Sequence, residues 1–191
     1  MIKIVSVSAI RQIEDAANEA GFTFDLMMEN AGGAIARRAA ALLEKLPDPA
    51  DGKITILVGS GKNGGDGLVA ARLLAASSPA QVRVYLLKKR PDDDPLLAAV
   101  RAAGVFIADA EDDQRYRVLS HMISSANLVI DALFGIGVQL PLRDEVVKFL
   151  RAARAAINGS ERGEENLEGS IFYPTDPTTV EHITRPYILA V

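Results

Sequence analysis

The chain has 191 residues, of which 49% are hydrophobic, a formal net charge of −4 and no cysteine. This composition predicts one globular domain with a sizeable core, gives no general attraction to nucleic acid or anionic membrane, and excludes disulfides, a thiol nucleophile and cysteine-ligated zinc. No apolar run approaches transmembrane length and the first residues do not resemble a signal peptide, so we expect a cytoplasmic protein.

Two helices are expected before the first strand. Ser8 is a suitable N-cap for a helix to about Glu19, with Ile10, Ile13 and Ala17 on one face, and a second helix is expected at about 25–46. Strands and helices then alternate, with strands at 54–59, 81–88, 105–108, 128–131 and 187–191 and helices at 65–77, 93–103, 112–124 and 142–157. Such repeated βα units predict a Rossmann-like three-layer α/β/α sandwich with a mainly parallel sheet.

One segment interrupts the alternation. Residues 159–186 are polar and rich in Gly, Glu, Thr and Pro, which is typical of a long surface loop. We expect this loop to be an insertion within a single domain that spans residues 1–191.

The most informative segment joins the first strand to the next helix. Residues 58–68 contain five glycines together with Lys62, Asn63 and Asp66. Glycines allow positive φ and a close approach of the backbone to a ligand, and the helix that follows directs free N–H groups toward the same place. The segment predicts an anion-binding turn, most simply for phosphate or pyrophosphate.

This turn differs from the two common nucleotide-binding turns. The pattern G-x-G-x-x-G is present at Gly59, Gly61 and Gly64, but the second strand ends in the basic residues 88–90 instead of the acid that binds the ribose of NAD. No Gly-Lys-Ser/Thr follows, as a P-loop requires. An NADP-dependent oxidoreductase stays an alternative because basic residues suit a 2′-phosphate, although no Tyr-x-x-x-Lys pair supports it.

A second site-like segment follows the strand expected at 128–131. Asp131 lies at the carboxyl end of that strand and precedes Gly135 and Gly137, at the edge where parallel sheets form their sites. The simpler alternative is that Asp131 caps the next turn. The two histidines, His121 and His182, are isolated in sequence, which argues against a Ser-His-Asp hydrolase.

Three blocks of the chain resemble the NAD(P)H-hydrate epimerase family, in the same order. They run from Met28 to Gly32, from Gly59 to Arg72, and from Asp131 to Gly137 with residues 141–143 behind it. The N-terminal helix with Glu14 is also similar. The resemblance covers nearly the whole chain outside the 159–186 loop, and its second block is long and highly specific.

The resemblance implies an enzyme of nicotinamide nucleotide repair. The family interconverts the R and S epimers of NADHX and NADPHX, which form when water adds across a nicotinamide double bond, so that a dehydratase that uses one epimer can restore the whole pool. The nucleotide is the substrate and not a redox cofactor. The resemblance also implies a homodimer, and a dehydratase that is either separate or fused on the same chain.

The resemblance further implies which residues form the site. Substrate binding is expected at two segments, Lys62, Asn63, Gly64, Gly65 and Asp66 and then Gly135, Ile136, Gly137, Val138, Gln139, Leu140 and Pro141. A potassium ion is expected at Asn63 and Asp131, whose amide and carboxylate oxygens suit a hard cation. The catalytic residue stays open, with Asp66 and Asp131 as candidates.

The chain departs from the family in three places. Lys62 stands where the family has asparagine, and Leu140 where an arginine is common. The family also continues past the strand at 187–191 into Asp-x-Pro-Ser-Gly, which supplies an acid and another potassium ligand. We therefore expect a fragment of a longer protein that is a poor epimerase as it stands.

A non-catalytic binding module is the remaining alternative. The same fold serves dimerisation in an mRNA-decapping scaffold protein, and such a role predicts that the ligand residues are lost. Asn63, Asp66 and Asp131 are all present here, which argues against this alternative.

Overall fold

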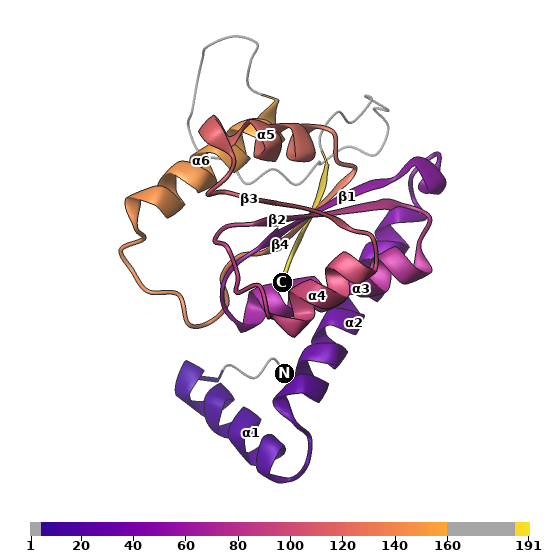
Figure 1. Cartoon of the computed structure of the whole chain (residues 1–191). Helices are drawn as coiled ribbons and strands as arrows, with labels where there is room; N and C mark the ends of the chain where they lie inside the picture. Colours follow the sequence, from indigo (N-terminus) through magenta and orange to yellow (C-terminus); the bar gives the residue numbers. More distant parts are fainter. Residues whose placement is uncertain (1–4, 160–185) are drawn as a thin grey trace.

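The computed structural model of the chain describes residues 5–159 and 186–191, so nearly all of the loop expected at 159–186 lies outside the described residues. At the centre of the fold is a five-stranded parallel sheet in the order β3-β2-β1-β4-β5 (Figure 1). Its strands are β1 (Lys53–Val58), β2 (Gln81–Leu86), β3 (Phe106–Asp109), β4 (Leu128–Ala132) and β5 (Tyr187–Ala190). The predicted strands are thus confirmed.

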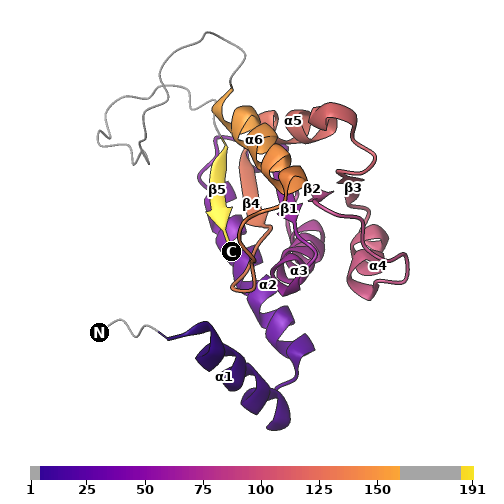
Figure 2. The ribbon, with the colours of Figure 1, turned by 90° about the vertical axis from the view of Figure 1, so that its left-hand side faces the viewer.

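Helices cover both faces of this sheet. The helices of the described residues are α1 (Val7–Glu19), α2 (Phe24–Leu43), α3 (Lys62–Ser77), α4 (Pro95–Ala102), α5 (Arg117–Ser124) and α6 (Asp144–Asn158), with 3₁₀ turns at η1 (Pro49–Asp51) and η2 (Gln114–Tyr116). Helices α3 and α4 and the C-terminal part of α2 lie on one face, and α5 and α6 lie on the other (Figures 1 and 2). The predicted three-layer α/β/α sandwich is confirmed.

Side chains that alternate along the strands form two separate cores. Ile54, Ile56 and Val58 point to the face under α2, α3 and α4, while Leu57 packs with Tyr85 and Phe149 under α5 and α6. Strands buried on both faces need hydrophobic residues at most positions, which is why β1 is apolar at Ile54 and at residues 56–58. Among the helices of the described residues, none is long and apolar enough to cross a membrane.

Helix α1 stands apart from the sheet and lies below it in both Figure 1 and Figure 2. It begins at Val7 and not after Ser8, because Ser6 is the N-cap and its Oγ accepts the N–H of Ala9 at 3.2 Å. No residue of α1 is buried, and Ile13 is 62% exposed. The apolar face expected from its sequence is present, but little of the described part of the chain covers it.

Helix α5 begins five residues later than expected, at Arg117 instead of residue 112. Arg115 and Tyr116 adopt left-handed backbone angles, which interrupt a helix. The cause is Asp113, whose buried carboxylate accepts hydrogen bonds from the Tyr85 hydroxyl and from the N–H groups of Val118 and Leu119. The hydrogen bond from Tyr85 holds Asp113 in place, and Asp113 in turn sets where the helix starts.

Candidate functional site

The carboxyl ends of β1 and β4 lie side by side at the point where the strand order reverses. Val58 pairs with Ala132, and just beyond the ladder the N–H of Gly59 donates to the carbonyl of Ala132 at 3.1 Å. From this edge, β1 leads into α3 and β4 leads into the loop at 133–143. Crevices at such switch points are the usual ligand sites of parallel sheets.

The glycines after β1 serve packing, and none of them uses the positive φ that glycine allows. In the described residues, positive φ occurs at glycines 21, 104 and 159, none of them in this segment. The reason is that α3 begins at Lys62, so most of the expected turn is helical. A Cβ at Gly64 would overlap the carbonyl oxygen of Gly59, and one at Gly67 would lie 2.7 Å from the Cβ of Ala132. These glycines let α3 lie directly against the ends of β1 and β4.

A cavity of about 720 Å³ opens at this edge. It brings together seven of the residues expected to bind substrate, which are Lys62, Asn63, Asp66, Gly135, Ile136, Gly137 and Val138. The other lining residues are Ile10, Arg11, Glu14, Asp15, Ser60, Gly61, Leu87, Leu133, Phe134 and Val191. Helix α1, the start of α3 and the loop after β4 each supply part of the lining.

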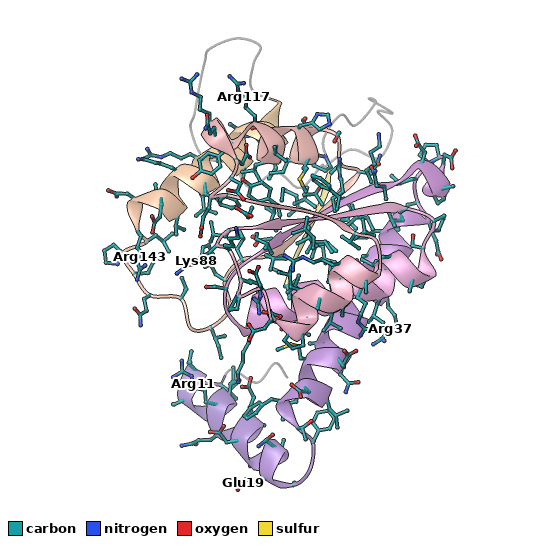
Figure 3. All side chains as sticks on the ribbon, in the orientation of Figure 1. Arg11, Glu19, Arg37, Lys88, Arg117 and Arg143 are labelled. Carbon is teal, nitrogen blue, oxygen red and sulfur yellow. The ribbon has the colours of Figure 1, made fainter. Side chains whose placement is uncertain are left out.

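A second cavity of about 700 Å³ adjoins the first and shares with it Ser60, Leu87, Phe134 and Val138. Gln139 and Pro141 line it, as do Lys88 and Arg143, which are labelled at this edge in Figure 3. The remaining expected positions lie elsewhere. Leu140 is 79% exposed and lines neither cavity, while Gly64 and Gly65 are buried inside α3, where a Cβ on Gly65 would meet the sulfur of Met28.

Three charged groups interact on the wall of the first cavity. The Lys62 Nζ lies 3.1 Å from Glu14 Oε2 and 4.2 Å from the centroid of the Phe24 ring, so it joins α3 to α1. Burial raises the pKa of Asp66 from 3.8 to about 6, aided by the negative charge of Glu14 and opposed by the positive charge of Lys62. The carboxyl group of Asp66 therefore changes protonation state close to neutral pH.

The two expected potassium ligands present oxygens suited to a hard cation. The amide nitrogen of Asn63 is buried without a hydrogen-bond partner in the described residues, and Asn63 lies beside Gly135. Asp131 is partly buried, and its Oδ1 accepts the N–H of Leu133 at 3.0 Å, so it also caps the following turn. Within residues 5–159 and 186–191, no three His, Asp or Glu side chains form a group that could hold a metal. Potassium binding stays a prediction.

Sequence reasoning did not assign α1 to the site. Arg11 extends from α1 toward the loop after β4, and its Nη2 lies 3.9 Å from where a Cβ of Gly137 would be (Figure 3). With Glu14 and Asp15 it forms a charged lining opposite the glycine segment. The sequence does show that α1 has an apolar stripe beside these charged residues. Only the tertiary structure shows that the charged side of α1 faces the cavity.

The family comparison agrees with this geometry. A family model described as "YjeF-related protein N-terminus" matches residues 25–163, which include the glycine segment, β4 and the loop after it. The chain belongs to this family. The predicted family is thus confirmed.

Several curated relatives are named for one activity. The chain is 37% identical over 83% of its length to the "Bifunctional NAD(P)H-hydrate repair enzyme Nnr" of Thermofilum pendens, and covers 29% of that protein. It is 33% identical to the "NAD(P)H-hydrate epimerase" of Giardia intestinalis, with 69% of the chain and 50% of the relative covered. It is 30% identical to the protein of the same name in Elusimicrobium minutum, with 83% and 71% covered. The chain thus spans half or less of the first two relatives.

A solved yeast structure, YNL200c, has the same fold. The two superpose with a TM-score of 0.69 at 23% sequence identity, over 82% of this chain and 67% of the yeast chain. At this identity the likeness supports the fold alone.

Proposed function

We propose that this domain is an NAD(P)H-hydrate epimerase that interconverts the R and S epimers of NADHX and NADPHX. The observation that carries the proposal is the first cavity. Two segments that match the family, the start of α3 and the loop after β4, meet there although they lie about 70 residues apart in sequence. The names of the relatives supply the reaction.

The start of α3 suits the pyrophosphate of the substrate. Its N-cap is Gly61, which has no side chain to accept hydrogen bonds from the first N–H groups of the helix, and Lys62 adds a positive charge at the same place. A helix N-terminus with a nearby cation is a favourable environment for phosphate groups. The nicotinamide end would then lie toward Asp66 and the loop after β4, where the reaction requires a proton donor and acceptor.

A potassium ion would be held by Asn63 and Asp131. The side-chain oxygen of Asn63 and the second carboxylate oxygen of Asp131, for neither of which a hydrogen bond is found in the described residues, are the ligand atoms that support this assignment. The ion would supply a fixed positive charge near the nucleotide when bound.

The proposal also covers partners and location. A dehydratase that consumes one epimer is the expected partner, fused or separate, because two of the relatives named here differ in that way. A homodimer would cover the exposed side chains of Val7, Ile13, Phe22 and Leu26 on and after α1, which favours apolar contact. A cytoplasmic location suits the substrate and a chain without cysteine.

The test is to follow epimer exchange directly. One epimer of NADHX is enriched with a dehydratase, the dehydratase is removed, and return to the equilibrium ratio is followed by NMR with and without the protein, in potassium and in choline buffers. We expect faster exchange with the protein, and faster still with potassium. Asn63→Ala should slow exchange and raise the potassium concentration required, whereas Asn158→Ala, at the exposed end of α6, should change neither.

Exchange at the spontaneous rate in every buffer, both with this chain and with a chain extended at its C-terminus, would overturn the proposed function. If calorimetry then still shows binding of NADHX, the non-catalytic module is the better reading of this fold. Exchange that is fast but equal in potassium and choline would overturn only the potassium assignment.

A further inference from the structure

Asp66 and Asp131 are the two catalytic candidates that the sequence offered, and the structure distinguishes them. Asp131 already accepts a backbone hydrogen bond from Leu133 and is not among the residues that line the cavity. Asp66 lines the cavity, is partly buried, and its carboxyl group has no hydrogen-bond partner in the described part of the chain. A group that must give and take a proton needs an open path to the substrate, and of these two carboxylates only Asp66 lines the cavity.

We propose that Asp66 is the catalytic acid and base of the epimerisation, with Glu14 and Lys62 as positioning residues that tune its carboxyl group. The inference rests on the proposed function and extends it by naming the residue that moves the proton. It also gives α1 a role, since Glu14 reaches the cavity from that helix.

The chemistry requires two proton transfers, one from Asp66 to the substrate and one from the added water back to Asp66. The reacting carbon carries a hydroxyl group and is bonded to the ring nitrogen. Protonated Asp66 gives its proton to the hydroxyl, the C–O bond breaks, water leaves, and the nitrogen lone pair forms a C=N⁺ bond. Water then adds to the other face of this carbon, the C=N⁺ electrons return to nitrogen, and the added water's proton returns to the Asp66 carboxylate. Substrate and product have the same composition, and no oxidant or reductant takes part.

The charges around Asp66 suit both halves of this cycle. Burial and the Glu14 carboxylate favour the protonated form, whereas Lys62, one helical turn before Asp66, favours the ionised form. With a pKa of about 6, roughly a tenth of the Asp66 side chains are protonated at pH 7, so both forms are available. Lys62 is itself fixed by Glu14 at 3.1 Å, so the two tuning charges are coupled.

Other charges near Asp66 are few. On α1, Arg11 and Asp15 line the same cavity. On α2, which packs against this part of α3, Glu29 is paired with Arg72 at 2.7 Å. Residues 133–138 contribute no ionisable side chain to the cavity. Glu14 and Lys62 are therefore the charges to change in a test.

The test measures exchange rate against pH at fixed potassium in four variants. Asp66→Asn should lower the rate about 10²–10⁴-fold, as loss of a proton-transfer group does. Glu14→Gln removes a negative charge, so the pH above which the rate falls should move down. Lys62→Gln removes a positive charge, so this pH should move up. Asp15→Asn, a matched carboxylate on the same cavity wall, should leave this pH in place because Asp15 has no part in the shift of Asp66.

An independent readout is the Asp66 carboxyl carbon, titrated by NMR in the protein without substrate. Its midpoint should follow the pH profile, lower in Glu14→Gln and higher in Lys62→Gln. If the wild-type protein catalyses exchange but Asp66→Asn keeps most of its rate, this inference fails and the proposed function stands. It also fails if the two charge variants leave the pH profile where it was, which tests it even if Asp66→Asn does not fold. Absence of exchange activity both in this chain and in a chain extended at its C-terminus overturns the proposed function and this inference together.

Discussion

Replacing Gly64 by alanine should destabilise the fold, whereas the same change at Gly61 should not. A Cβ on Gly64 would overlap the Gly59 carbonyl oxygen and lie 2.7 Å from its carbon, although real Cβ atoms essentially never come within 3.0 Å of such a neighbour. The obstacle is backbone, held by the hydrogen bond from Gly59 to Ala132, so α3 must move away from β1. A Cβ on Gly61 meets nothing within 4 Å, and φ there is −90°, which alanine adopts without strain.

The expected magnitude follows from two opposing effects. Forcing an extra methyl into a packed site costs about 1–3 kcal/mol, here at the upper end, and the better helix propensity of alanine returns up to about 1 kcal/mol. Gly64→Ala should therefore lose about 2 kcal/mol, which lowers Tm by about 4–8 °C in a domain of this size. Gly61→Ala should lose a few tenths of a kcal/mol at the N-cap.

Urea and thermal unfolding of the two variants, followed by circular dichroism, check this difference. Equal stability of the two variants would refute the packing role of Gly64. It would instead favour a role of this glycine in the close approach of the backbone to a ligand.

Three further predictions concern buried polar groups. Asp113→Ala should lower the free energy of unfolding by about 2–4 kcal/mol in urea, because the Tyr85 hydroxyl and two helix N–H groups lose their acceptor; a loss below 1 kcal/mol would contradict the role given to this residue. Burial raises the pKa of Asp94, but the hydrogen bonds from Arg90, Leu97 and Leu96 outweigh it and hold this pKa below 3.8 in the folded protein. The stabilising effect of Asp94 is therefore full above pH 3.8 and disappears as the pH falls through the pKa of the folded state. Asp94→Asn should flatten the acid side of a plot of Tm against pH, and an unchanged slope would count against this pairing. Arg83 is buried without a carboxylate partner in the described residues and donates only to Ser125, Thr55 and Met122. The free energy of unfolding of Arg83→Met should therefore stay within about 1 kcal/mol of wild type, whereas that of Arg83→Ala should fall further. Equal losses of stability in the two variants would refute this.

The sheet could be predicted because its signal is local. Strands buried on both faces must be apolar at nearly every position, and β1 and β4 are, so their place and parallel arrangement follow from sequence. The start of α3 could not be predicted in the same way, because glycines normally mark a turn. Here they allow close packing against β4, which depends on residues far away in the chain.

The site was predictable on the same terms. The rule that sites form at the carboxyl ends of parallel strands places Asn63, Asp66 and the loop at 135–138 together, and the cavity contains all of them. This rule does not predict Glu14 and Arg11, because they come from α1, which does not pack against the sheet. Where α1 lies is set by the turn at residues 20–23 and by the Lys62–Glu14 pair, and neither shows in a periodic pattern.

The pairing of β1 with β4 has a consequence for the order of folding. β1, α3 and β2 follow one another in sequence, so they can form an early unit from local contacts. β4 must then close a long loop to reach β1. Three hydrogen bonds outside the ladder fix it there, two between Lys53 and Asn127, 74 residues later, and one from Gly59 to Ala132. We expect a chain emerging from the ribosome to form the glycine segment well before the cavity exists. Any ligand of the cavity would therefore stabilise only the completed sheet and would give no help to its early intermediates.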